Sequence, residues 1–180
     1  YDNRQTVSYS TAAQSLKKAL EEVLAREDAR VAFIPGSTCT LRCFAYPTRY
    51  LTDVTKTVDN VEKNIASTKD VTAESNLTDA EHWIIESNGT AGHYKLKNKS
   101  TGRYISTIAK NTKATTGATA KDFVLTEIQT ALWGFNGGDH QWINCGVSYD
   151  FDIIGWNAGA EASKWYIVMT EKDEAVVAEN

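Results

Sequence analysis

Three similar units follow one another between about residues 39 and 169, and this repetition limits the possible folds more than any other feature of the sequence. Each unit begins with an apolar segment. A middle segment follows, made of a polar, an aromatic, a branched aliphatic and a small polar residue, and a closing segment carries a second aromatic residue. The opening segments are CTLRCF (39–44), HYKLKN (93–98) and ALWGFN (131–136), the middle segments are RYLT (49–52), RYIS (103–106) and QWIN (141–144), and the closing segments are EHWIIES (81–87), KDFVLTE (121–127) and SKWYIVM (163–169).

Each unit predicts four β-strands, because short runs of aliphatic, Thr and aromatic residues alternate with Gly, Asn, Ser, Asp and Lys. The clearest hairpin is in the second unit, where Gly102 lies between the segments 93–98 and 103–106. Three units of four strands give twelve strands. A six-stranded barrel capped by three hairpins accommodates this number and removes exposed strand edges. The sequence therefore predicts an all-β fold, the β-trefoil.

Six aromatic residues recur at equivalent places in the units, and we expect them to form layers of the barrel core. They are Tyr50, Tyr104 and Trp142 in the middle segments, and Trp83, Phe123 and Trp165 in the closing segments. The first unit has extra residues between Tyr50 and Trp83. There we expect two short strands with an elaborated loop, although part of VDNVEKNIAS could form a helical turn instead.

A helical pattern precedes the repeats. From about Ser10 to Arg30, apolar residues recur at a spacing that predicts one amphipathic α-helix; they are Ala13, Leu16, Leu20, Val23 and Leu24. We therefore divide the chain into an N-terminal helix or linker (1–34), a β-trefoil domain (35–172) and a tail (173–180).

The charge of the chain argues against polyanionic partners. The formal net charge is −4 and the isoelectric point is about 5.4, whereas nucleic acids and anionic membranes bind to cationic surfaces. No apolar run reaches the length of about 18 residues that a membrane-spanning helix needs. We expect no nucleic-acid partner and no membrane insertion.

The cysteines, Cys39, Cys43 and Cys145, leave several arrangements open. On one strand, Cys39 and Cys43 would lie about 13 Å apart, which is too far for a disulfide bond. Cys145 could pair with either of them, or all three could be buried thiols that act as small apolar groups. The sequence has no CxxC or HxxxH pattern and its histidines are far apart, so we predict no metal site.

The segment YKLKNKSTGRYIS (94–106) resembles the ricin-type β-trefoil lectin domain. A repeat of that family opens with Tyr-x-Leu-x-Asn, turns at Ser-x-Gly-Lys/Arg and closes with Gln-x-Trp. The matching residues here are Tyr94, Leu96, Asn98, Ser100, Gly102 and Arg103. The resemblance covers about residues 36–170. The closing segments keep the aromatic residue but carry Glu81, Lys121 and Ser163 in place of Gln, which is largely structural in the family, and the sugar-binding Asp of the family is not evident after any opening strand.

The resemblance implies a non-catalytic, glycan-binding module that is a monomeric domain of a larger secreted or cell-surface protein. Modules of this family are often attached to secreted glycosidases, and the N-terminal helix would then be a spacer. The missing family Asp supports a second hypothesis, a structural or protein-interaction β-trefoil that does not bind sugar.

The third unit is richest in the groups that a sugar site needs, which are an exposed aromatic face and nearby polar side chains. The candidate carbohydrate-binding residues are Trp156, Asn157, Asp152, Asp150, Tyr149 and His140. We expect a strand that places Asp150 and Asp152 on the face opposite Tyr149, Phe151 and Ile153. The alternative is that the aspartates are solvated and that the Trp packs a loop.

The sequence has no pattern typical of an enzyme. Asp150 and Asp152 are too close on one strand to act as the opposed carboxylates of a glycosidase. Gly-x-Ser-x-Gly, phosphate-loop and dinucleotide-binding patterns do not occur. We therefore expect no catalytic residues and no cofactor.

Overall fold

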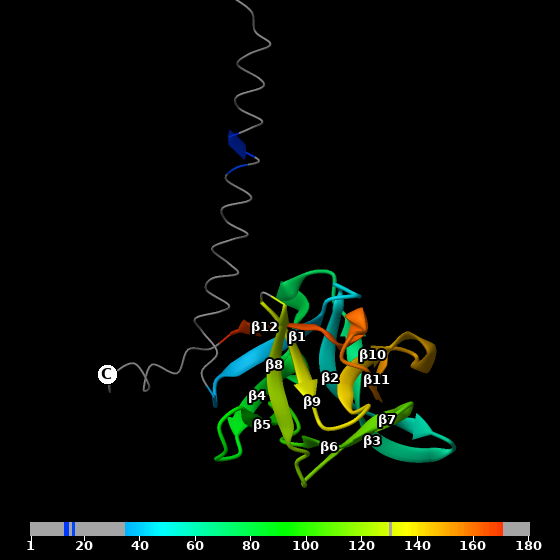
Figure 1. Cartoon of the computed structure of the whole chain (residues 1–180). Helices are drawn as coiled ribbons and strands as arrows, with labels where there is room; N and C mark the ends of the chain where they lie inside the picture. The colour runs from blue at the N-terminus through cyan, green and yellow to red at the C-terminus, as the bar shows by residue number, and fades with distance from the viewer. Residues whose placement is uncertain (1–12, 15, 17–34, 130, 171–180) are drawn as a thin grey trace, which may run out of the picture. The chain divides into compact units, whose positions relative to one another are not determined.

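Twelve β-strands lie in the part of the chain that the structure describes. The structure is a computed structural model, and it describes residues 13, 14, 16, 35–129 and 131–170 (Figure 1). The chain divides into two compact units, Tyr1–Ala32 and Phe33–Asn180, and the strands belong to the second. The helix predicted for residues 10–30 lies outside the described residues except at Ala13, Gln14 and Leu16, and the tail lies wholly outside them. Both remain predictions.

The strands fall into three consecutive sets of four, one set for each predicted unit. The first repeat contains β1 (Thr38–Cys43), β2 (Arg49–Val58), β3 (Val61–Asp70) and β4 (His82–Ser87); the second contains β5 (His93–Asn98), β6 (Tyr104–Ala109), β7 (Thr112–Gly117) and β8 (Phe123–Gln129); the third contains β9 (Leu132–Asn136), β10 (Trp142–Gly146), β11 (Asp152–Trp156) and β12 (Trp165–Met169). Short 3-10 helices lie in the connections, at η1 (Glu74–Asn76), η2 (Asp79–Glu81), η3 (Val147–Tyr149) and η4 (Glu161–Ser163).

Six of the strands close into a barrel. The first strand, β1, pairs with β12 and β4; β5 pairs with β4 and β8; and β9 pairs with β8 and β12, all antiparallel. These pairings return to the strand at which they begin, so the barrel has no free edge. The prediction of a six-stranded barrel is confirmed.

The other six strands form three hairpins, β2–β3, β6–β7 and β10–β11. Strand β7 joins them, because it pairs with β3 and with β11 (Figure 1). Each hairpin also continues from a barrel strand in an equivalent register: the facing pairs are Arg42 and Tyr50, Lys97 and Tyr104, and Asn136 and Trp142. The same four-strand unit is therefore built three times.

Equivalent side chains from the three repeats fill the barrel, and each is at most 1% exposed. They are Leu41, Leu96 and Phe135 from the opening strands, Leu51, Ile105 and Ile143 from the middle strands, and Trp83, Phe123 and Trp165 from the closing strands. The predicted place in the barrel core is confirmed for the closing aromatics, but it is wrong for the three middle aromatics: Tyr50 is buried outside the core cluster, with its hydroxyl at Glu74, and Tyr104 and Trp142 are only half-buried. The next residue along each of these strands points inward instead, because neighbours on a strand face opposite ways.

The indole N–H groups of two closing tryptophans hydrogen-bond to buried carbonyls of the middle strands. Trp83 Nε1 donates to the carbonyl of Leu51, and Trp165 Nε1 donates to the carbonyl of Ile143, both at 2.9 Å. The side chain of Phe123 has no N–H group. In the second repeat the backbone N–H of Lys121 donates instead to the equivalent carbonyl of Ile105, at 2.8 Å. Different donors thus satisfy the same backbone position in each repeat.

Two residues that stand where the ricin-type pattern has Gln are buried and hydrogen-bonded. Glu81 Oε1 accepts a hydrogen bond from Thr52 Oγ1 at 3.3 Å, and Ser163 Oγ accepts one from Asn144 Nδ2 at 2.9 Å. Thr52 and Asn144 are equivalent members of the middle segments. The link between closing and middle segments is therefore kept without Gln.

The extra residues of the first repeat lengthen both a hairpin and the connection that follows it. The expectation of short strands is wrong, whereas an elaborated loop is present, in the segment 71–81 that contains η1 and η2. Strands β2 and β3 have ten residues each, whereas β6 and β7 have six each. Asp59 and Asn60 connect the long strands with φ of 53° and 61°, the left-handed conformation of a two-residue hairpin turn. The alternative of a helical turn in this segment is also wrong, because residues 61–65 pair in register with 54–58.

We expect Trp165→Phe to lower the free energy of unfolding by about 1–3 kcal/mol, because the buried carbonyl of Ile143 would lose its donor. Urea denaturation followed by circular dichroism measures the loss. Trp142→Phe is the matched control, because the Trp142 indole is half-buried and makes no hydrogen bond with a described residue. Equal losses for the two variants would show that the indole N–H contributes nothing to stability.

Candidate functional site

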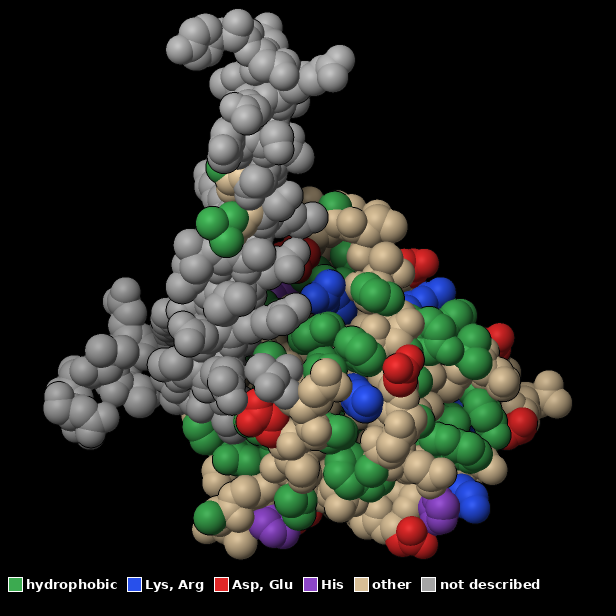
Figure 2. Space-filling model, turned by 45° about the horizontal axis from the view of Figure 1, so that its top comes forward, with side chains coloured by type: hydrophobic (Ala, Val, Ile, Leu, Met, Phe, Trp, Pro, Cys, Tyr) green, Lys and Arg blue, Asp and Glu red, His purple; other side chains and the backbone are tan. Residues whose placement is uncertain are grey.

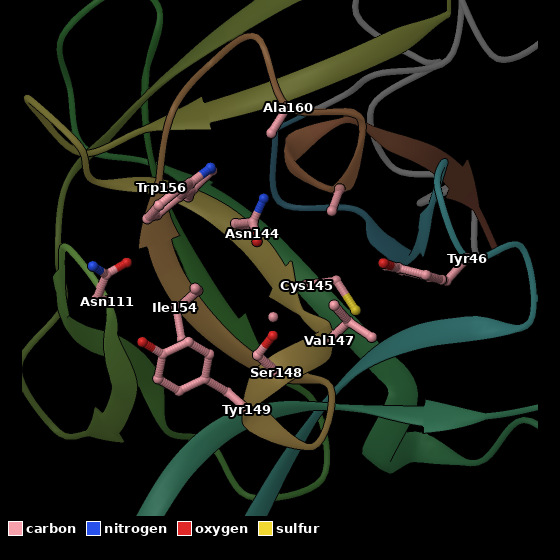
Figure 3. A pocket seen from close by; sticks show the side chains of 12 residues that line it. Tyr46, Asn111, Asn144, Cys145, Val147, Ser148, Tyr149, Ile154, Trp156 and Ala160 are labelled. Atoms are coloured by element: carbon pink, nitrogen blue, oxygen red, sulfur yellow. The ribbon is translucent and has the colours of Figure 1, made fainter.

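A cleft of about 430 Å³ lies beside the β10–β11 hairpin of the third repeat (Figure 3). Its walls come from β10 and β11, the loops that follow them, and single residues of the other two repeats. The lining residues are Tyr46, Asn111, Asn144, Cys145, Gly146, Val147, Ser148, Tyr149, Ile154, Trp156, Ala160 and Ala162. All three repeats therefore contribute to one site.

The loop that carries Tyr149 is held in an irregular conformation. After η3, Asp150 and Phe151 both have positive φ, at 58° and 59°, which is uncommon for residues other than glycine. The backbone N–H of Phe151 donates to the carbonyl of Gly146 at 3.0 Å. The Arg49 guanidinium lies 4.0 Å from the centre of the Phe151 ring, and the Tyr46 ring meets that ring edge-on at 5.2 Å. These contacts with the first repeat fix the loop.

Gly155 brings Asn111 of the second repeat close to Trp156. The backbone N–H of Asn111 donates to the carbonyl of Gly155 at 3.1 Å. A side chain at Gly155 could not fit, because its Cβ would lie 2.5 Å from the carbonyl oxygen of Ala109 and 2.6 Å from that of His140. The absence of a side chain here lets the β6–β7 turn reach the cleft.

A chain of hydrogen bonds sets the position of the loop after β11. Asn144 Nδ2 donates to Ser163 Oγ at 2.9 Å, and Ser163 Oγ donates to the carbonyl of Asn157 at 2.8 Å. Asn144 and Ser163 are both buried. The loop that they hold carries Ala160 and Ala162, which line the cleft with small apolar side chains.

The lining combines aromatic, aliphatic and neutral polar groups. No Asp, Glu, Lys, Arg or His side chain is among the described residues that line the cleft. The side chains of Asn111, Ser148 and Tyr149 make no hydrogen bond with another described residue, so they have capacity for a ligand. In Figure 3 the Tyr149 hydroxyl points toward Asn111, and Trp156 lies above them in the view.

The structure brings together two of the six predicted site residues, Trp156 and Tyr149, on this cleft. Asp150 and Asn157 are exposed, and His140 is half-buried in the β9–β10 connection; none of these three side chains lines it. The predicted alternation from Tyr149 to Ile153 is wrong, because residues 147–149 form η3 and the strand begins only at Asp152.

The sequence prediction missed four polar lining residues, Tyr46, Asn111, Asn144 and Ser148. Asn144 could have been noticed, because it ends the middle segment QWIN of the same repeat. Tyr46 and Asn111 come from other repeats, and only the folded chain places them beside Trp156.

Asp152 is a buried structural ion rather than a group that faces the cleft. Its side chain is 0% exposed, with Lys56 Nζ 2.5 Å from Oδ1 and Lys113 Nζ 2.7 Å from Oδ2. Ser67 Oγ also donates to Oδ1 at 2.6 Å. These partners lie on β2, β7 and β3, while Asp152 opens β11, so the cluster joins all three hairpins. The alternative reading of solvated aspartates holds for the exposed Asp150 and is wrong for Asp152.

Residues outside the cleft give no sign of a metal site or a membrane span. Among the described residues, no three His, Cys, Asp or Glu side chains are grouped in a way that could hold a metal ion. None of the helices in the described part of the chain has the length and apolar character to cross a bilayer. On the face shown in Figure 2, acidic and basic side chains are scattered among hydrophobic and neutral ones.

Solved structures identify the fold. The Rhizoctonia solani agglutinin matches with a TM-score of 0.61 and 16% identity, over 76% of this chain and 97% of that one. The designed threefold-symmetric protein ThreeFoil matches with a TM-score of 0.56 and 12% identity, over 74% and 99%. The fold is a β-trefoil. At these identities the likeness shows the fold alone, and the neighbours include β-trefoil lectins.

The chains of some other neighbours extend well beyond the part that this chain matches. The Polyporus squamosus lectin, in a structure with a human-type influenza-binding epitope, matches with a TM-score of 0.57 and 14% identity over 76% of this chain, which spans about half (50%) of that lectin chain. No protein family and no curated protein matches the sequence.

We expect Asp152→Asn to lower the free energy of unfolding by about 3 kcal/mol, because Lys56 and Lys113 would lose their shared counter-charge. Thermal or urea denaturation measures the change. Asp150→Asn is the control, since Asp150 is exposed and its loss should leave stability nearly unchanged. If the two variants were equally stable, the buried ion cluster would not hold the hairpins together.

Proposed function

We propose that this chain is a non-catalytic carbohydrate-binding module and that the cleft beside Trp156 binds the glycan. The observation that carries the proposal is the uncharged cleft itself, in which three aromatic residues, Tyr46, Tyr149 and Trp156, line the same space as polar side chains that make no hydrogen bond with a described residue. This arrangement would use Trp156 and Tyr149 from the predicted set, together with Asn111 and Ser148.

The chemistry of the lining suits a neutral sugar. A pyranose ring has an apolar face of C–H groups that packs on an aromatic ring, and its hydroxyls exchange hydrogen bonds with amides and hydroxyls. The half-buried indole of Trp156 offers the ring, and Asn111 and Ser148 offer polar groups. A volume of about 430 Å³ is within the ordinary range of small-molecule sites.

The neighbours lend support at the level of the fold. The Polyporus squamosus lectin is bound to the epitope Neu5Acα2-6Galβ1-4GlcNAc, and the lectin SeviL, a neighbour with a TM-score of 0.52 and 11% identity, is bound to the asialo-GM1 saccharide. Both proteins bind glycans on a scaffold of this shape. A fold hosts more than one function, so the cleft carries the proposal and the scaffold only raises its plausibility.

The lining argues against catalysis at this site. Hydrolysis of a glycoside by the usual route needs two carboxyl groups on opposite sides of the bond, and no carboxyl group lines the cleft. Asp152, the nearest candidate along the strand, is held by two lysines. We therefore assign the cleft to binding.

The module would serve as an accessory domain of a larger secreted or cell-surface protein, and would itself be monomeric. Trefoils of this shape occur within longer chains: the matched region is 33% of an endo-β-galactosidase from Clostridium perfringens and 18% of a mosquitocidal holotoxin.

A protein-interaction trefoil is the second candidate, and the long β2–β3 hairpin favours it. Its tip exposes Val61, which is 55% exposed, next to the turn residues Asp59 and Asn60. In this case the hairpin would recognise a partner protein and the cleft would bind no sugar.

A glycan array with the full chain, followed by calorimetry on each ligand found, tests the proposal. We expect neutral glycans to bind, and Trp156→Ala to weaken binding at least about tenfold through the loss of stacking. Trp142→Ala is the matched control, because Trp142 faces Trp156 across the β10–β11 pair but does not line the cleft. It should leave the affinity unchanged.

Salt dependence provides a second readout. An uncharged site should keep its affinity when the salt concentration is raised, because there is no ion pair to screen. The proposal is wrong if no glycan binds. If a protein partner binds instead, with an affinity that depends on Val61, the chain is the protein-interaction trefoil of the second candidate.

A further inference from the structure

The cleft has two ends, which come from different repeats. Trp156 and Asn111 lie at one side of the cleft in Figure 3, and Tyr46 lies at the opposite side. Asn111 belongs to the turn between β6 and β7 in the second repeat, and Tyr46 belongs to the connection between β1 and β2 in the first. We call these places the Trp156 end and the Tyr46 end. A ligand that touches both of them bridges two repeats across the third.

The β10–β11 hairpin shows that the cleft is longer than one sugar ring. The pairing begins at Trp142 with Trp156 and ends at Gly146, which lies about 13 Å further along the strand. Val147, which also lines the cleft, follows directly after Gly146. The cleft volume of about 430 Å³ is in the range that holds a drug-sized molecule. A single pyranose is smaller than such a molecule and would leave part of the cleft empty.

The Tyr46 end is held in one orientation by its neighbours. The Tyr46 ring meets the Phe151 ring edge-on at 5.2 Å, and the carbonyl of Tyr46 accepts the backbone N–H of Arg49 at 2.8 Å. The Tyr46 hydroxyl makes no hydrogen bond with a described residue, and in Figure 3 it points toward Cys145 and Val147. A rigid aromatic group with a free hydroxyl loses little freedom when it binds a ligand. This end is therefore a second place at which a sugar can pack.

The floor between the two ends carries one free acceptor. Cys145 lines it as a buried thiol, and all three cysteines of the chain are free. Asn144, which lies between Trp156 and Cys145 in Figure 3, is only 5% exposed. Its Nδ2 donates to Ser163 Oγ at 2.9 Å, whereas its Oδ1 accepts no hydrogen bond from a described residue. A sugar hydroxyl near the linkage between two units can donate to this oxygen.

We propose that the cleft binds a neutral oligosaccharide of at least two sugar units, with one unit stacked on Trp156 and another packed against Tyr46. This inference rests on the proposed function, because it takes the cleft as the glycan site. A single sugar touches only one end at a time. When two units are linked, the second contact forms within the complex that the first has made, and the affinity rises accordingly. The ligand is thus a saccharide chain rather than one terminal sugar.

A comparison of sugars of different length tests the inference. The array of neutral glycans includes cellobiose, xylobiose, lactose and diacetylchitobiose, longer chains, and the component monosaccharides. Calorimetry with the full chain follows, on the smallest glycan that binds and on the methyl glycosides of its component sugars. We expect this glycan to bind at least about tenfold more tightly than any of the methyl glycosides. Trp156→Ala should weaken the binding of both kinds of ligand.

Tyr46→Phe tests the second end. It removes the hydroxyl and keeps the ring against Phe151, and it should weaken binding of the glycan about threefold or more without changing the affinity for the methyl glycoside. Tyr166→Phe is the matched control. Tyr166 is also half-buried and its ring meets that of Phe44 edge-on at 6.0 Å, but it does not line the cleft. This control variant should bind every ligand as the natural sequence does.

The possible results separate this inference from the proposed function. The inference is overturned, and the proposed function stands, if a methyl glycoside binds as tightly as the glycan that contains its sugar. The same holds if Tyr46→Phe weakens glycan binding no more than Tyr166→Phe does. If neither a monosaccharide nor any longer glycan binds, the inference and the proposed function are both overturned.

Discussion

Closure of the barrel is the constraint on which the rest of the structure depends. The pairing of β1 with β12 runs over five residue pairs, from Cys39 with Met169 to Cys43 with Trp165, and it joins the first and last strands of the trefoil. Because of this closure, Trp165 reaches the core beside Leu41 and Ile143. It also brings the first repeat against the third, which places Tyr46 on the cleft.

The side chains inside the barrel repeat closely from one unit to the next, whereas the hairpins and connections outside it differ among the repeats. The candidate site lies among these differing parts. Inside, Leu51, Ile105 and Ile143 fill equivalent places because a closed barrel offers each repeat the same space. Outside, the connections are free to differ. The first repeat uses this freedom for a long hairpin, and the third uses it for the loop of Tyr149. The candidate site of this trefoil therefore lies where the third repeat departs from the other two.

Polar groups within the fold are used to connect the repeats, which leaves few of them for a ligand. Asp152 is enclosed by lysines from two other hairpins, and Asp53 is held by Arg103 and Thr116. Burying such carboxylates requires charged partners, so they are poor candidates for binding sugar. The groups that remain at the cleft are neutral, and this neutrality is what favours an uncharged glycan.

The repeat pattern and the strand periodicity are local properties, so the sequence alone was enough to predict twelve strands in three sets of four and the closing aromatics in the core. It also pointed to Trp156 and Tyr149. Only the tertiary structure decided that Asp152 is an internal ion, that Tyr104 and Trp142 face outward, and that Asn111 and Tyr46 complete the cleft. These outcomes depend on which repeats touch, and the distances between residues of different repeats are fixed by barrel closure, which no single stretch of sequence encodes.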